Sequence, residues 1–152
     1  MKPSRVWKGS NVPIEGGVPG WSGRNVRRDE VRSEEIARVM SGADVAFLPL
    51  SFEPGMRHVV ETSFPSKTAE YLAAGVPVLV HAPAYSTVAR YCREHDCGLV
   101  IDQPDEAALR EGLVRLANDA ALRKELSAKA VEATAKNHDA REIVAAFLQE
   151  FT

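Results

Sequence analysis

Three short apolar runs, separated by helix-like segments, constrain the fold more than any other feature of the sequence. The runs occupy residues 45–50, 77–80 (followed by His81) and 98–101. A strand without polar alternation must be covered on both faces, as in a parallel sheet. The helix-like segments 66–74 and 85–95 connect the runs. Because strands that alternate with helices form βαβ units, the sequence predicts an α/β fold with an open, doubly wound parallel sheet and helices on both faces.

The flanking segments differ from this central part. Proline and glycine interrupt residues 1–32, which we interpret as a loop-rich arm or linker with at most one short strand, near residues 5–7 or 12–14. A helix is expected over residues 33–42, with Ser33 as N-cap and Gly42 just past its end. Beyond Asp102, residues 105–119, 120–136 and 139–151 predict a helical C-terminal tail. We therefore divide the chain into an arm (1–32) and one domain (33–152).

Composition and charge exclude several classes of protein. A net charge of −2 and a pI near 6.1 give no overall attraction to nucleic acid, so no nucleic-acid partner is expected. The local basic cluster is interpreted as a solvated surface; it comprises Arg24, Arg27, Arg28 and Arg32. No apolar stretch reaches the roughly 18 residues that a membrane span needs, and the first residues lack a secretory signal. We expect a cytoplasmic protein without a transmembrane segment.

Common catalytic and metal-binding patterns are missing from the sequence. No G-x-G-x-x-G follows a strand, and no G-x-S-x-G accompanies the scattered histidines. Cys92 and Cys97 flank His95 with spacings too short for a four-ligand zinc site, so we interpret both as reduced thiols, with a metal or redox site as the alternative. His81 differs from the other histidines because it ends an apolar strand, at the edge of a parallel sheet where ligands bind. A structural role for His81 is the alternative.

The beginning of the helix at residues 66–74 is the strongest candidate for a binding site. Hydroxyl and cationic side chains gather there, namely Thr62, Ser63, Ser66 and Lys67. The unpaired amide groups and the positive dipole of a helix N-terminus attract anions, and hydroxyls with a lysine suit phosphate. Glu70 lies on the same helix face as Lys67, so its carboxylate would reach ribose hydroxyls beside a phosphate. A surface ion pair between Lys67 and Glu70 is the alternative.

Three segments resemble the family 4 GT-B glycosyltransferases. FPSKTAEYLAAGVPVLV is similar to their central donor-binding motif, GADVAFLPLSFE to the strand and loop before it, and PDEAALREGLVRLANDAALRKELSAKA to the helices that close the domain. The resemblance covers about two thirds of the chain. It implies a Rossmann-like nucleotide-sugar-binding domain in which Glu70 binds the ribose and Lys67 lies near the diphosphate. It further implies polar contacts from Ser63 and Ser66, and a structural role for Gly75 at the helix end.

The sequence also departs from that family. Thr62 stands where many members have an acid, and Glu53 and Glu61 lie out of register. Arg57 could supply positive charge to the diphosphate; the alternative is a mobile, solvated loop. The resemblance predicts a nucleotide sugar as ligand. The chain has room for one of the two Rossmann-like domains, so we also expect either an acceptor-binding partner chain or self-association. No metal or cofactor is expected. An interaction module that binds no nucleotide sugar is the alternative function.

Overall fold

The computed structural model describes residues 6–8, 40 and 42–137 of the 152-residue chain. Four strands form one sheet, and every neighbouring pair in it is parallel. The strands follow one another in chain order: β1 (Val6–Lys8), β2 (Val45–Pro49), β3 (Val78–His81) and β4 (Gly98–Ile101). The predicted α/β fold with an open parallel sheet is therefore confirmed.

The three apolar runs are adjacent strands, as predicted. Ala46 pairs with Val78, and Val78 pairs in turn with Gly98, so β2, β3 and β4 lie in register across the sheet. β1 pairs with β2 on the other side, and it overlaps the first of the two expected positions for an early strand, shifted by one residue. The remainder of the predicted arm lies outside the described residues.

Helices connect the strands and follow them. The described helices are η3 (Pro54–Met56), α2 (Arg57–Thr62), α3 (Ser66–Ala73), α4 (Thr87–Glu94), α5 (Glu106–Asn118) and α6 (Ala120–Asn137). The predicted helices at 66–74, 85–95, 105–119 and 120–136 correspond to α3 to α6 with ends shifted by up to two residues. Of the helix predicted over residues 33–42, Met40 is helical and buried and Gly42 lies in a turn; the other residues of that segment, and the segment 139–151, lie outside the described residues.

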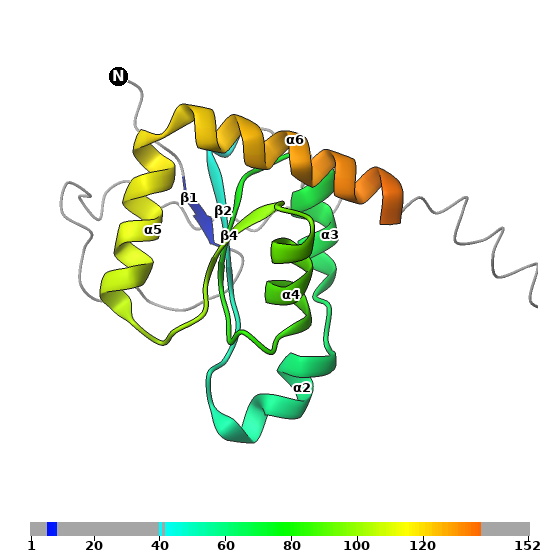
Figure 1. Cartoon of the computed structure of the whole chain (residues 1–152), viewed down its shortest axis with the longest axis vertical. Coiled ribbons are helices and arrows are strands. Elements are labelled where there is room, and N and C mark those ends of the chain that lie inside the picture. The colour runs from blue at the N-terminus through cyan, green and yellow to red at the C-terminus, as the bar shows by residue number, and fades with distance from the viewer. Residues whose placement is uncertain (1–5, 9–39, 41, 138–152) are drawn as a thin grey trace, which may run out of the picture.

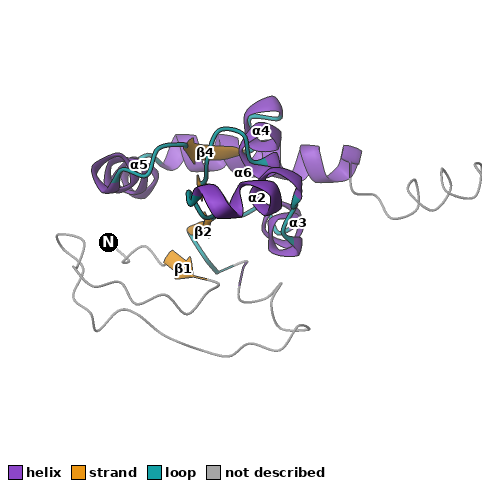
Figure 2. Cartoon of the chain, turned by 90° about the horizontal axis from the view of Figure 1, so that it is seen from below, coloured by secondary structure: helices purple, strands orange, loops and turns teal. Residues whose placement is uncertain are grey.

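Alternate residues of the strands face two separate cores. Ala46, Leu48, Val78 and Val80 pack with residues of α3, α4 and the second half of α6. Leu79 and its neighbours on the opposite face pack with α5 and the first half of α6. Figure 2 shows this division, with α5 on one side of the sheet and α3 and α4 on the other. Cover on both faces explains why the strands are apolar throughout.

The C-terminal end of α3 is fixed against α6 by a glycine. Gly75 has a φ of 65°, its N–H donates to the Leu72 carbonyl (3.0 Å), and the Val76 N–H donates to the Tyr71 carbonyl (3.2 Å). These two bonds define a Schellman motif, which requires the left-handed conformation that glycine adopts readily. The Ser127 hydroxyl on α6 donates to the Gly75 carbonyl at 2.6 Å. The structural role expected for Gly75 is thus confirmed.

The two ends of the parallel strands differ in their surroundings; we call the end where the strands finish the carboxyl edge of the sheet. α6 runs along the edge where the strands begin, at the top of Figure 1, whereas α2 projects beyond the edge where they end. α3, α4 and α5 all start at this carboxyl edge. The carboxyl edge therefore collects the loops and helix N-termini at which a ligand of an open parallel sheet binds.

No described helix is both long and apolar enough to cross a membrane.

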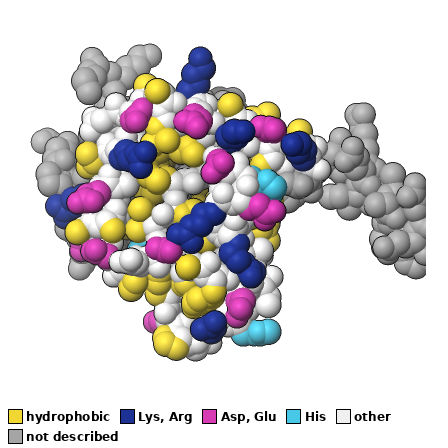
Figure 3. All heavy atoms as spheres, viewed as in Figure 1, with side chains coloured by type: hydrophobic (Ala, Val, Ile, Leu, Met, Phe, Trp, Pro, Cys, Tyr) yellow, Lys and Arg dark blue, Asp and Glu magenta, His cyan; other side chains and the backbone are white. Residues whose placement is uncertain are grey.

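β4 is the outermost strand on one side of the sheet. All four of its residues are only half-buried, although Leu99, Val100 and Ile101 are apolar. Figure 3 shows hydrophobic side chains gathered between α5 and α4 on the face of the molecule that contains this strand. Larger exposed apolar side chains are scattered elsewhere, on η3 and α2, on α5 and on α6.

Candidate functional site

The N-terminus of α3 differs from those of α4 and α5, which start at the same edge. At α4 the buried Ser86 hydroxyl accepts the Ala89 N–H (3.1 Å), and at α5 the Asp105 carboxylate accepts the Ala107 N–H (2.8 Å). α3 follows Pro65, which caps no amide, and has no acid in its first turn. Because a side-chain cap occupies a helix amide that an anion would use, α3 keeps its positive end available.

The structure brings the predicted phosphate and ribose residues together on this segment. Ser63 ends α2 in extended conformation, half-buried, and Ser66 begins α3 after only two intervening residues. Ser66, Lys67 and Glu70 are exposed to solvent on α3. One turn of helix separates Lys67 from Glu70, as the spacing predicts. Hydroxyl, ammonium and carboxylate groups therefore follow one another from the first turn of the helix inward.

Tyr71 shows the electrostatic effect of this surface on the core. Its side chain is buried beneath α3, whereas the adjacent Glu70 faces solvent. Burial and, to a smaller extent, the negative charge of Glu70 raise the pKa of the Tyr71 phenol to about 12. The phenol is therefore neutral at physiological pH, and its pKa reports on the charge of Glu70.

Arg57 lies in a helix and not in the loop expected as the alternative. Its guanidinium is 3.6 Å from the Glu61 carboxylate and 4.5 Å from the centre of the Tyr85 ring. The Thr87 hydroxyl donates to the Glu61 carbonyl at 2.5 Å, which ties α2 to the start of α4. Residues 54–62 are helical, which contradicts the loop of that alternative. Arg57 remains exposed at the carboxyl edge.

His81 has contacts with the loops that follow both neighbouring strands. Its Nε2 is 2.9 Å from the main-chain carbonyl of Gln103, after β4. Its ring centre is 4.9 Å from that of Phe52, after β2, at an interplanar angle of 47°. The structure therefore places His81 at the carboxyl edge, as predicted, with one ring nitrogen already engaged by the protein.

Sequence reasoning missed several residues that shape this edge. Phe52, Tyr85 and Thr87 carry contacts that join segments far apart in the chain. Spacing along the sequence gives no signal for such pairs. The cap at Ser86 did have a signal, because serine before a helix-like run is a strong N-cap; the predicted helix began two residues before the observed one.

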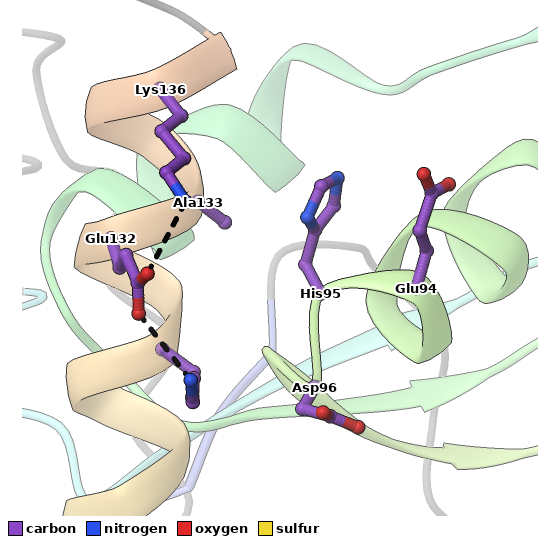
Figure 4. A pocket seen from close by; sticks show the side chains of 7 residues that line it. Glu94, His95, Asp96, Glu132, Ala133 and Lys136 are labelled. Atoms are coloured by element: carbon purple, nitrogen blue, oxygen red, sulfur yellow. Dashed lines mark hydrogen bonds and ion pairs between the residues drawn. The ribbon is translucent and has the colours of Figure 1, made fainter.

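A pocket lies away from these residues, between the end of α4 and the second half of α6. It encloses about 200 Å³ and is lined mainly by charged side chains, including Glu94, His95 and Asp96. Across it on α6, Glu132 is 3.4 Å from the Lys129 ammonium and 3.5 Å from that of Lys136 (Figure 4). Two ammonium groups thus compensate the charge of Glu132, and the candidate phosphate residues of α3 take no part in the lining.

Cys92 and Cys97 are free, buried thiols. A hydrogen bond with Cys97, together with burial, raises the pKa of the Cys92 thiol above its usual range. The described residues contain no group of three or more histidine, cysteine or acidic side chains placed to hold a metal ion. The two thiols therefore pack in the core beside α4 as a hydrogen-bonded pair.

Comparisons with known proteins show the family of the chain and agree with its fold. The family model of the glycosyl transferases group 1 matches residues 29–133, which is more than half of the chain. Among solved structures, WaaG, a glycosyltransferase involved in lipopolysaccharide biosynthesis, is similar with a TM-score of 0.56 and 26% identity. The similarity covers 76% of this chain but 28% of WaaG, so this chain spans less than a third of that protein. No curated protein gives a significant match.

Proposed function

The chain belongs to the glycosyl transferases group 1, and we propose that it forms the part of such an enzyme that binds the nucleotide-sugar donor. The observation that carries this proposal is the N-terminus of α3: an uncapped helix start at the carboxyl edge, with Ser66 and Lys67 in its first turn. Amide groups, the helix dipole and an ammonium group together suit a diphosphate. The parallel sheet and the similarity to WaaG support the same function.

In this proposal the donor lies along α3 from its first turn inward. The diphosphate binds at the amides of the first turn, with Lys67 as counter-charge and Ser63 and Ser66 as hydroxyl donors. The ribose hydroxyls bind Glu70, whose carboxylate accepts two hydrogen bonds when ionised. We assign Arg57 a peripheral role in the site, because Glu61 and Tyr85 already interact with its positive charge.

The reaction follows from the chemistry of such a donor. Cleavage of the bond between sugar and diphosphate leaves negative charge on the departing nucleotide, and fixed positive groups stabilise that charge. Lys67 and the amides of α3 would be these positive groups. The sugar is transferred to an acceptor hydroxyl, which we propose is held by a second domain, by a partner chain or by a second copy. A cytoplasmic location stays a prediction.

Calorimetric titration with UDP, GDP, ADP and their sugars tests the proposal. Lys67→Ala should weaken binding about ten- to a hundredfold, the equivalent of roughly 1.5–3 kcal/mol for a charge-assisted contact. Glu70→Ala should weaken nucleotides that contain ribose and leave inorganic pyrophosphate unaffected. Lys124→Ala and Glu125→Ala are matched controls, because both residues are exposed on α6, which runs along the opposite edge of the sheet.

Two results would argue for the alternative function, an interaction module that binds no sugar nucleotide. The first is no measurable binding of any nucleotide by the native chain. The second is binding that neither substitution on α3 alters. Melting temperatures of the four variants complete the test, since the exposed side chains of Lys67 and Glu70 should contribute little to stability.

A further inference from the structure

His81 occupies a central position at the carboxyl edge of the sheet. It is the last residue of β3, and its backbone pairs with Pro49 at the end of β2 and with Ile101 at the end of β4. Its carbonyl accepts the Leu50 N–H at 2.9 Å. The main chain of His81 is therefore fixed by both neighbouring strands just where their loops begin.

The side chain of His81 extends this connection into the loops. Nε2 lies 2.9 Å from the Gln103 carbonyl, which can only accept, so Nε2 carries the hydrogen and donates it. The same ring packs against Phe52 in the loop after β2. One half-buried side chain thus contacts two loops that are separated by about fifty residues of sequence.

We propose that His81 is a positioning residue for the nucleotide site, an inference that rests on the proposed function. Its ring joins the loop after β2 to the loop after β4 and so fixes the shape of the carboxyl edge beside α3. One feature supports a role beyond packing. The contact with the loop after β4 is directional, from a ring N–H to a main-chain carbonyl, and an apolar side chain in this place could not make it.

Three substitutions separate the two contacts of His81. His81→Phe keeps an aromatic ring against Phe52 and removes the N–H donor to Gln103. His81→Gln keeps a donor of similar reach and removes the ring. His81→Ala removes both. Amide hydrogen exchange, followed by NMR residue by residue, then measures the opening of each loop separately.

The expected pattern is selective. His81→Phe should speed exchange around residue 103 about two- to tenfold, the loss expected for one neutral hydrogen bond, and leave residues 51–53 unchanged. His81→Gln should do the reverse, and His81→Ala should affect both loops. Nucleotide affinity should fall most in His81→Ala and be partly restored in the two conservative variants.

The measurements distinguish failure of this inference from failure of the proposed function. Unchanged exchange at both loops in His81→Ala, or an equal increase throughout the chain, would overturn the positioning role. Changed exchange with unchanged nucleotide affinity would also overturn it, because the loops would then be braced without consequence for the site. If the native chain binds no nucleotide, the proposed function fails, and with it the link to the site; the exchange pattern still decides whether His81 braces the two loops.

Discussion

Gly75→Ala provides a quantitative test of how α3 is held against α6. The residue has a φ of 65°, and an L-residue other than glycine loses roughly 1–2 kcal/mol in that conformation. An added Cβ would lie 3.1 Å from Val131 Cγ2 and 3.3 Å from Ser127 Oγ, so both neighbours would have to move by a few tenths of an ångström. With a modest further cost from this crowding, we expect Gly75→Ala to lower the free energy of unfolding by about 1–3 kcal/mol.

Urea unfolding, monitored by circular dichroism, measures this loss. Gly55→Ala is the matched control, because nothing lies within 4 Å of a Cβ added there, and it should change stability by less than about 0.5 kcal/mol. Repeating Gly75→Ala in a Val131→Ala background removes the nearer contact and leaves the backbone strain. The part of the loss that Val131 causes should disappear there, while the contact with Ser127 Oγ remains. A loss below about 0.5 kcal/mol in the single variant would refute the reasoning.

Two further predictions concern ionisable groups. Glu70→Gln should lower the pKa of Tyr71 from about 12 yet keep it above 10, because burial, the larger cause, remains. The absorbance of the phenolate near 295 nm measures this pKa. An unchanged pKa would show that the charge of Glu70 does not act on Tyr71. The hydrogen bond from Arg93 (2.6 Å) lowers the pKa of Asp102. This stabilisation is present at pH 7 and lost as pH falls through the lowered pKa. Asp102→Asn should therefore cost less than about 1 kcal/mol at pH 7 and nothing near pH 2 in urea unfolding; equal costs would exclude the charge as the cause.

The strands could be predicted from the sequence because helices cover both of their faces, which makes them apolar throughout. β4 matches its predicted bounds, and β2 and β3 differ by one residue at their ends. The motif around Gly75 was equally accessible, since a glycine that follows a helix and precedes an apolar run is typical of a C-terminal cap. Local sequence suffices wherever the physical cause lies within a few residues.

The η3 and α2 segment could not be predicted in this way. Six residues after a proline and a glycine are too few for a recognisable helical period, and an isolated helix of this length is unstable. Its residues Arg57 and Glu61 contact Tyr85 and Thr87, which lie more than twenty residues further along the chain. The partners of His81 are hidden for the same reason, because only the parallel arrangement of the strands brings their loops together.

α3 connects the two edges of the sheet and thereby separates stability from binding. Its eight residues span about 12 Å, with Gly75 and Ser127 fixing one end and the proposed diphosphate site at the other. Strain at Gly75 acts on the balance between folded and unfolded chains, whereas the role that we propose for the exposed Lys67 is in ligand binding. Well below its unfolding midpoint, Gly75→Ala should keep the native nucleotide affinity, and Lys67→Ala should keep the native unfolding midpoint. If Gly75→Ala weakens nucleotide binding while the chain remains folded, α3 would have moved as a rigid body. The contacts of α3 with α6 would then help to set the geometry of the site.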